Sequence, residues 1–532
     1  MTFDQARPVA HTMAVLGGRI VALDDDTDGL ATRSKEDFGE STIFPGFHDA
    51  HCHTTSFGLH LGELNLSTPL VTTIEELYAV VAADARRAGS SGWIIGTGYD
   101  QNKLGGKHPA RGRLDEVAQG RPVWLQHVSG HMCVVNSEAL DRIGRSGLAR
   151  RIDGGVVERD GDGAPTGLLQ ERAQLLVRQL VLPRSLDELA TAIEQAHQRY
   201  LSEGLTSVCD AGIAGEWIGE SPIELAAYQQ ACDTGRLKVR TTVMIDSSVL
   251  HDVGAHAADT VATALDAGIR SGLGDDWLRI GPLKVFSDGS LIGRTCWMTE
   301  GFSDDSGNTG YPQADLGELR QAVVNAHRAG WQVATHAIGD AAVAFVLDCY
   351  EEALRQQPRQ DHRHRIEHCG LSTEESLARI AKLGVIPVPQ GRFVGEIGDG
   401  MTQALGPVRV GEAYRLASFV RRGIPLPASS DRPVVDGRPL LGIRDMVLRR
   451  TETGRPFGPV EAISCEEAMV AYTKGSAFAS RSEHERGSLG TGKLADFVVL
   501  GEDPRAVAPE AISDVPVLAT VIGGKVAHRA SG

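Results

Sequence analysis

The sequence predicts an α/β fold built on a (β/α)8 TIM barrel. Apolar, strand-like runs alternate with helical patterns through the middle of the chain, which is typical of repeated βα units around a parallel sheet. We count eight such strands, the number that closes a barrel. With 532 residues, of which 42% are hydrophobic and 23% charged, the chain can bury an extensive core.

The expected barrel strands lie near Phe47–His53, Thr206–Asp210, Val239–Asp246, Arg279–Phe286, Gln332–His336, Arg363–His368, Val385–Pro389 and Pro425–Asp431. Helical patterns separate several of them, at Ser185–Glu203, Leu316–Ala329, Ala341–Gln357 and Thr373–Leu383. Thr373 is a candidate N-cap of the last of these helices.

Two further units are expected outside the barrel. The stretch between the first and second strands is too long for one crossover, so it predicts an inserted subdomain, at about residues 60–180, that roofs the active site. Short alternating strands near both termini, with a hairpin at Gly523-Gly524, predict one discontinuous β-sandwich. The expected limits are 1–45 and 481–532 for the sandwich and 46–480 for the barrel.

The composition excludes some classes of function. A net charge of −16, without a long Lys/Arg run, argues against nucleic-acid binding. The eight cysteines show no paired spacing, so we expect reduced thiols in a cytoplasmic protein. We expect no amino-terminal signal and no membrane span, because the apolar run Met13–Leu16 stops at Gly17 and no run approaches the roughly 20 apolar residues of a spanning helix.

The end of the first strand carries the most informative pattern. His51 and His53 are two residues apart on an extended strand, so both imidazoles are expected on one face, where they can bind one cation. Taken alone, the pair is equally compatible with two partly exposed loop histidines. Cys52, between them, should face the other way and serve packing.

Ligand-type residues also end four later strands: Lys284, His336, His368 and Asp431. Because the carboxyl ends of barrel strands share one rim, these side chains are expected to converge with His51 and His53. Two simpler interpretations stay open at this point. Lys284 is compatible with a strand-end lysine that extends to solvent, and Asp431 with a turn before Arg432-Pro433.

Seven motifs together resemble the metal-dependent amidohydrolase superfamily, in amidohydrolase family 3, the branch that includes the N-substituted formamide deformylases. The motifs are Pro45-Gly46-Phe47-x-Asp49-x-His51-x-His53, Gly130-His131-x-x-x-Val135-Asn136-Ser137, Thr166–Glu171, Lys284-x-x-x-Asp288-Gly289-Ser290, His336-x-x-Gly339-Asp340, Arg365–His368 and Ser430-Asp431-x-Pro433-Val434. The similarity runs nearly end to end and includes the tail at Gly487–Phe497.

The resemblance implies a binuclear centre with two divalent metal ions, zinc in the first instance. It makes His51 and His53 ligands of one ion, His336 and His368 ligands of the other, and a carboxylated Lys284 the bridge between them. A carbamate is attracted by two dications, whereas an ammonium is repelled. Asp431 would contact the first ion and shuttle a proton, while a metal-activated hydroxide attacks a small-molecule substrate at a non-peptide, amide-type C–N bond. The sequence leaves open whether the protein forms a homodimer.

His131 and Glu171, from the insertion or its exit, are candidate substrate-binding residues. A histidine with satisfied hydrogen bonds in a polar loop and a carboxylate on a helix face would explain these two residues about as well. Tyr99 is a third candidate, at a position where the family commonly has tryptophan. His48 is a departure from the family, which generally has an apolar residue there.

Two alternative functions are kept. A mononuclear deaminase of the superfamily places a glutamate shortly after the fifth-strand histidine, whereas here Ala337–Asp340 follow, and strand alternation predicts that Glu367 points away from the lumen. The second alternative is a barrel that has lost its catalytic activity and acts as a scaffold for protein interactions. Such a barrel should have lost metal-ligand residues, but all six expected positions carry a ligand-type residue. The metal content distinguishes these functions. About two zinc ions per chain favour the binuclear hydrolase, one favours the deaminase, and none favours the scaffold.

Overall fold

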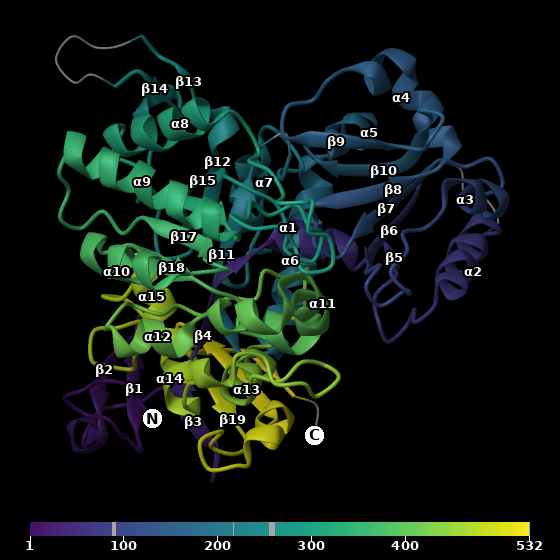
Figure 1. The fold of residues 1–532 in the computed structure, drawn as a ribbon. Coiled ribbons are helices and arrows are strands. Elements are labelled where there is room, and N and C mark those ends of the chain that lie inside the picture. Colours follow the sequence, from purple (N-terminus) through teal and green to yellow (C-terminus); the bar gives the residue numbers. More distant parts are fainter. Residues whose placement is uncertain (88–91, 216, 255–260, 531–532) are drawn as a thin grey trace.

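The computed structural model describes residues 1–87, 92–215, 217–254 and 261–530. Seven parallel strands form its central sheet, in the order β18-β17-β16-β15-β12-β11-β4 (Figure 1). They are β4 (Phe47–Cys52), β11 (Leu205–Ile213), β12 (Arg240–Asp246), β15 (Leu278–Phe286), β16 (Val333–Ala337), β17 (Arg365–His368) and β18 (Ile386–Val388).

An eighth segment, residues 428–432, closes this sheet into a barrel. On one side Ser429 forms a parallel bridge with Gln390, just beyond β18. On the other side Ala50 N donates to Ala428 O at 3.0 Å and Asp431 N donates to His51 O at 2.7 Å, which joins the segment to β4. The predicted (β/α)8 barrel is therefore confirmed, with an irregular eighth strand.

Helices cover the outside of the barrel, so its strands are buried on both faces and consist mainly of apolar runs. Thr373 Oγ1 accepts from Ser376 N and caps its helix as predicted. The helices of the barrel and its loops are α1 (Thr54–His60), α6 (Leu186–Ser202), α7 (Glu224–Asp233), α8 (Leu316–Arg328), α9 (Asp340–Gln356), α10 (Glu374–Leu383), α11 (Arg392–Arg409), α12 (Leu416–Arg421), α13 (Pro439–Leu448), α14 (Cys465–Val470) and α15 (Ser476–Ala479).

The insertion after the first barrel strand forms a second sheet, in the order β5-β6-β7-β8-β10-β9, which lies beside the barrel in Figure 1. Its strands are β5 (Leu64–Asn65), β6 (Ile94–Tyr99), β7 (Val123–His127), β8 (Met132–Val135), β9 (Gly155–Arg159) and β10 (Pro165–Glu171). Its helices are α2 (Ile74–Ala85), α3 (Arg111–Val117), α4 (Ser137–Ala149) and α5 (Leu175–Val181).

Strands from both ends of the chain pair with each other, as predicted. The sheet order is β21-β20-β19-β3, and a hairpin of β1 and β2 packs on it through a core that includes Ile20, Phe497 and Val521. These strands are β1 (Met13–Leu16), β2 (Arg19–Leu23), β3 (Thr42–Pro45), β19 (Phe497–Leu500), β20 (Val517–Ile522) and β21 (Lys525–Arg529). Two short strands, β13 (His251–Asp252) and β14 (Thr263–Ala264), pair in antiparallel fashion near α8 (Figure 1).

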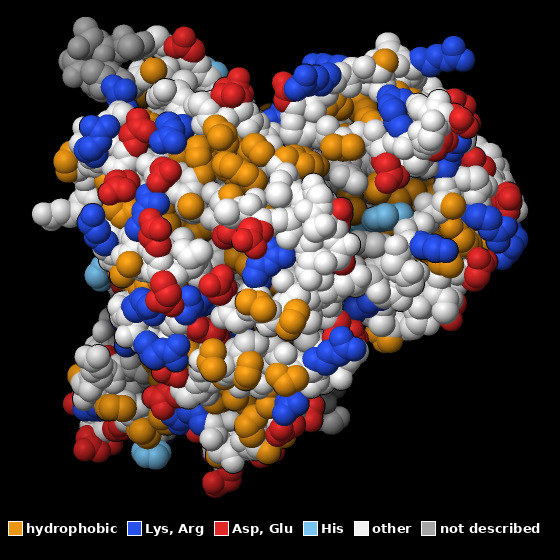
Figure 2. Space-filling model, viewed as in Figure 1, with side chains coloured by type: hydrophobic (Ala, Val, Ile, Leu, Met, Phe, Trp, Pro, Cys, Tyr) orange, Lys and Arg blue, Asp and Glu red, His pale blue; other side chains and the backbone are white. Residues whose placement is uncertain are grey.

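The surface carries charges of both signs. On the face drawn in Figure 2, the Lys and Arg side chains are interspersed with Asp and Glu. Among the described residues, no helix is both long enough and apolar enough to cross a membrane.

A buried histidine connects α6 to the start of β12. His197 Nδ1 accepts hydrogen bonds from Lys238 N at 3.1 Å and Val239 N at 3.3 Å, so the neutral ring fits this position and the charged ring does not. Burial lowers the pKa of His197 to about 3. In the unfolded chain a histidine pKa is about 6.5, so the unfolded state takes up a proton that the folded state does not as the pH falls below that value.

We therefore expect His197→Asn, which retains an acceptor near the Nδ1 position, to flatten the acid dependence of stability. The wild-type protein should lose about 2 kcal/mol through this group between pH 7 and pH 5. Denaturant unfolding of the metal-free proteins at the two pH values measures this difference. His484→Asn, at an exposed position, should leave the pH dependence unchanged; an equal slope in His197→Asn and wild type would contradict the assignment.

Candidate metal centre and substrate pocket

The six predicted ligand residues lie at the carboxyl ends of the barrel strands, where barrels of this class carry their functional groups. A row of imidazole rings runs across this rim in the order His53, His51, His368, His336 and His131, with successive ring centroids 5.4, 4.9, 4.5 and 5.1 Å apart. The closure of the barrel thus brings together side chains that are up to several hundred residues apart in the sequence.

Three of these residues form a compact group that suits a divalent cation. Ligand atoms of His51, His53 and Asp431 all lie within 4.8 Å of one another. Asp431 Oδ1 is 3.0 Å from His53 Nε2 and 3.2 Å from His51 Nε2. Two imidazoles and a carboxylate are donors that zinc accepts, so this set fits the predicted first metal ion.

Glu367, which the sequence did not assign to the site, fixes the orientation of His51. His51 Nδ1 is hydrogen-bonded to Glu367 Oε2, while within the described part of the chain the buried His51 Nε2 has no hydrogen-bond partner. Because the Nδ1 proton is directed to the carboxylate, the Nε2 lone pair is left for a cation. This unpartnered buried atom supports the fit between the donor set and a metal ion.

The prediction that Glu367 points away from the lumen is wrong. His368 has a φ of +68°, which breaks the strand alternation, so Glu367 and His368 both reach the centre. Arg365 contacts Glu367 through two hydrogen bonds of 2.7 and 2.8 Å. Burial alone raises the pKa of Glu367, but Arg365 and His51 together lower it far below its usual value.

His368 and His336 lie beside the three-residue group. His368 Nδ1 is 2.7 Å from Gln390 Oε1, which leaves its Nε2 lone pair for a second cation. His336 Nε2 instead donates to Gly289 O at 3.1 Å and lies 3.4 Å from Asp288 Oδ1. In this arrangement His336 can offer only Nδ1 to a metal ion.

Lys284 is buried in the barrel, so the interpretation as a lysine that extends to solvent is wrong. Its side chain is 1% exposed, and its Nζ lies 4.7 Å from the centroid of the Phe286 ring. Burial lowers the pKa of Lys284 to about 8, although Glu367 and Asp431 act in the opposite direction. The neutral fraction of this amine near neutral pH is therefore larger than that of an exposed lysine, which makes it more nucleophilic.

His131 and Glu171 meet beside His336. His131 Nδ1 is 2.7 Å from Glu171 Oε2, which also accepts from Gln313 Nε2 at 2.7 Å. Burial lowers the pKa of His131, but Glu171 outweighs this effect and the net shift is upward. The sequence missed Trp217, whose ring centroid lies 5.3 Å from that of His131.

Tyr99 lies elsewhere. It is fully buried in the core of the inserted sheet, where its Oη is 3.2 Å from His108 Nδ1 and its ring packs 5.1 Å from His127. This placement gives no support to the prediction that Tyr99 contacts the substrate.

A small pocket opens beside the ligand cluster. His131, His368 and Asp431 contribute to its lining, together with Ser129 and Ser290. The rest of the lining is largely apolar and includes Leu291, Ile338, Phe393, Met401 and Val434. Within the described residues, neither lysine nor arginine lines this pocket.

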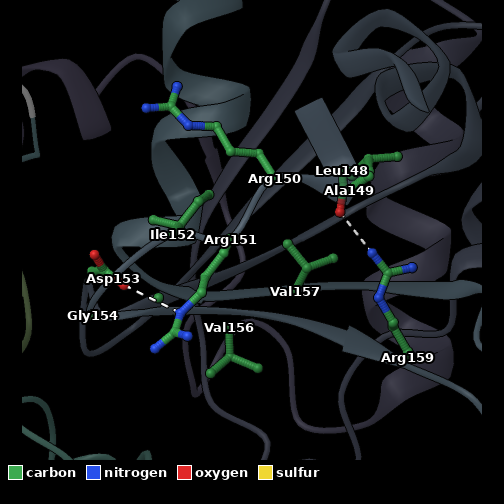
Figure 3. A pocket seen from close by; sticks show the side chains of 11 residues that line it. Leu148, Ala149, Arg150, Arg151, Ile152, Asp153, Gly154, Val156, Val157 and Arg159 are labelled. Atoms are coloured by element: carbon green, nitrogen blue, oxygen red, sulfur yellow. Dashed lines mark hydrogen bonds and ion pairs between the residues drawn. The ribbon is translucent and has the colours of Figure 1, made fainter. Parts of the chain in front are cut away.

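A separate, open depression lies on the inserted sheet, between the end of α4 and β9 (Figure 3). Arg159 donates to Leu148 O at 2.6 Å and Arg151 lies 3.4 Å from Asp153. This depression shares no lining residue with the pocket at the barrel rim, and its lining carries arginines but no histidine or cysteine. It is therefore not the candidate active site.

Comparison with known proteins agrees with this geometry. A model of the amidohydrolase family matches residues 37–528. The chain belongs to the amidohydrolase family. The amidohydrolase is 32% identical to Protein LONG AFTER FAR-RED 3 of Arabidopsis thaliana, over 98% of this chain and 89% of that protein.

Two further relatives bear on function. The amidohydrolase is 28% identical to N-substituted formamide deformylase of Arthrobacter pascens, over 100% of this chain and 97% of that enzyme. The crystal structure of an uncharacterized metal-dependent hydrolase from Pyrococcus horikoshii OT3 superposes with a TM-score of 0.72 at 25% identity, covering 94% of this chain and 95% of that one. This chain is accordingly a metal-dependent hydrolase of the amidohydrolase superfamily.

We expect Glu367→Gln to weaken zinc binding by the amidohydrolase about 10- to 100-fold, because a neutral amide orients and polarises His51 less well than a carboxylate. Competition with a chelator of known affinity measures the change. Glu461→Gln is the matched control, since Glu461 is also buried and paired with an arginine, Arg415, but lies outside the cluster. Equal zinc affinity in the two variants would contradict the role of Glu367.

Proposed function

We propose that this amidohydrolase hydrolyses a non-peptide, amide-type C–N bond of a small molecule with the help of two divalent metal ions, most simply zinc. The observation that carries the proposal is the compact group of His51, His53 and Asp431, which borders a small pocket next to further histidines. The resemblance to a formamide deformylase over the whole chain supports a C–N bond as the target.

The two ions would be held by residues that the barrel already brings together. His51, His53 and Asp431 would bind the first, His336 and His368 the second, and a carboxylated Lys284 would join them. When bound, the ions would polarise the substrate carbonyl and lower the pKa of coordinated water.

Lys284 suits carboxylation in two respects. Its lowered pKa, about 8, provides the neutral amine that reacts with carbon dioxide. Its position at 1% exposure, among groups such as Glu367 and Asp431, keeps the product away from bulk solvent. The carbamate would replace a buried cation by an anion with two ligand oxygens.

Asp431 is the proposed proton carrier. Burial alone raises its pKa, but the imidazoles of His51 and His53 beside it hold the pKa of Asp431 well below its usual value, so the group is present as the carboxylate that can accept a proton. It lines the pocket and can therefore reach the substrate. As the water oxygen bonds to the carbonyl carbon, Asp431 takes up the proton, and it passes this proton to the nitrogen as the C–N bond breaks.

Deamination is less well supported. Glu367 is the carboxylate nearest in sequence to a ligand histidine, yet it does not line the pocket, and Arg365 holds it ionised. A carboxylate with a strongly lowered pKa and two hydrogen bonds to a buried guanidinium is a poor proton shuttle.

The eight cysteines, all within the described residues, are unpaired, which supports our proposal of a cytoplasmic location.

The test is a screen of linear amides, lactams and carbamates with zinc-loaded enzyme, combined with metal analysis. We expect about two zinc ions per chain and hydrolysis of at least one amide class. One ion with ring deamination would favour the alternative, and no bound metal would indicate a scaffold.

We expect Asp431→Asn to lower kcat by about 10²–10⁴-fold, since the amide cannot carry the proton. Metal analysis of the same preparation should show occupancy close to wild type, because histidines and Lys284 supply the other ligands. The control Asp399→Asn removes an acidic group that bonds Thr451 and Thr453, outside the pocket. Turnover near that of wild type with Asn at position 431 would remove Asp431 from the proton-carrier role.

A further inference from the structure

Tyr414 presents an unpartnered phenol at the pocket. The residue lines the pocket together with His368 and Asp431, and it is only 1% exposed. Its Oη has no hydrogen-bond partner among the residues that the structure describes. An unsatisfied buried donor destabilises a fold by about 1–3 kcal/mol, so such groups are rare unless a ligand or water completes them.

The backbone around Tyr414 is held in an unfavourable conformation. Tyr414 has a φ of +49°, in the left-handed region that bulky residues seldom adopt. Its N–H donates to Gly370 O at 2.8 Å. Strained residues of this kind persist only where the surroundings fix them, and they cluster at functional sites.

A buried arginine provides that fixation. The Arg449 side chain donates to Tyr414 O at 3.1 Å, to Ala413 O at 3.1 Å and to Phe457 O at 3.0 Å. Arg449 is fully buried, and burial lowers its pKa to about 10. Its partners are carbonyl oxygens of the backbone, so a costly buried cation is used to fix the loop that carries Tyr414.

The pocket wall next to Tyr414 is apolar. The Phe393 ring packs edge-on against Tyr414 at 5.8 Å, and Met401, Ile397 and Val434 extend the same wall. Among the described residues, the pocket lining includes no lysine or arginine that would neutralise a carboxylate on the substrate. The wall therefore suits an uncharged, apolar substituent.

We propose that Tyr414 is a catalytic residue that donates a hydrogen bond from Oη to the carbonyl oxygen of a neutral amide, whose apolar substituent lies against Phe393 and Met401. The inference rests on the proposed function and specifies its substrate class. As the carbonyl oxygen gains negative charge during attack, a donor that is already in place stabilises it more than it stabilises the ground state.

The phenol can act as a donor throughout the physiological pH range. Burial raises the pKa of Tyr414 well above its usual value, and the nearby Asp431 adds to this shift. His131, another donor in the lining, already has its Nδ1 bonded to Glu171, whereas Tyr414 Oη has no such competing contact among the described residues.

The kinetic test uses Tyr414→Phe in the zinc-loaded, full-length enzyme, with N-pentylacetamide and the substrates found in the amide screen. We expect kcat/KM to fall by about 10²–10³-fold, mainly in kcat, as for loss of one donor to a developing oxyanion. Zinc content and the unfolding midpoint should stay close to wild type, because the ring is retained. N-acetylnorleucine, which adds only a carboxylate to N-pentylacetamide, should be the poorer substrate.

Tyr78→Phe is the control variant. In the inserted subdomain the Tyr78 hydroxyl of α2 accepts from Ala110 N at 2.8 Å, so its loss tests a general effect of removing a buried phenol oxygen. A kcat/KM of Tyr414→Phe within about threefold of the control would overturn the inference. If N-acetylnorleucine were preferred, the proposed neutral substrate class would be wrong.

A binding measurement tests the role of Tyr414 even if the wild-type enzyme hydrolyses no amide. Absence of hydrolysis would contradict the proposed function, whereas the binding result decides on Tyr414. Calorimetry with zinc-loaded protein and N-pentylacetamide should give about fivefold weaker binding to Tyr414→Phe than to wild type, as expected for one neutral hydrogen bond. Equal affinities, or no binding to either protein, would overturn the role of Tyr414.

Discussion

Closure of the barrel by residues 428–432 is the constraint on which the site depends. The hydrogen bond from Asp431 N to His51 O joins the last strand to the first, and it also sets the Asp431 carboxylate against His51 of β4 and His53 just beyond it. Backbone pairing and ligand geometry are thus one arrangement. This arrangement requires strained backbone, because Asp431 and His368 both have positive φ where the strands end. Regular strands would extend past the rim and direct alternate side chains away from it.

Charge balance inside the barrel explains why this cluster is stable before any ligand is considered. The buried Arg365 would be unfavourable alone, but its two hydrogen bonds to Glu367 neutralise it, and Glu367 then orients His51. Arg365 also donates to Ala50 O on the first strand at 2.8 Å, so the same cation holds β17 against β4. Removal of either partner would leave an uncompensated charge, which makes this pair part of the barrel as much as part of the site.

The sequence predicted the fold well because barrel strands and amphipathic helices leave local periodic patterns. The seven regular strands and the Thr373 cap all lie close to their predicted positions. The six candidate ligand residues stood out because each lies at or near the end of an apolar run, and the structure places all six at the rim of the barrel. Glu367 was misplaced because the positive φ of His368 has no signature in the residue types, and the irregular eighth strand shows the same limit. Trp217 and Tyr414 come from loops, and the approach of Trp217 to His131 and of Tyr414 to the pocket depends on tertiary packing that no periodicity encodes.

The pocket wall and the metal-binding rim are built on different cores, which has consequences for how specificity can change. Phe393, Met401, Tyr414 and Val434 belong to one hydrophobic cluster, whereas the layer between the barrel strands and their helices forms another. A substitution in the wall therefore removes contacts from a small local cluster, while the strand pairing that positions His51 and Asp431 is unaffected. Arg449 adds a polar connection within this cluster, since its buried guanidinium joins the Tyr414 loop to the segment at Phe457. The wall can vary in shape as long as this one connection keeps the phenol in place.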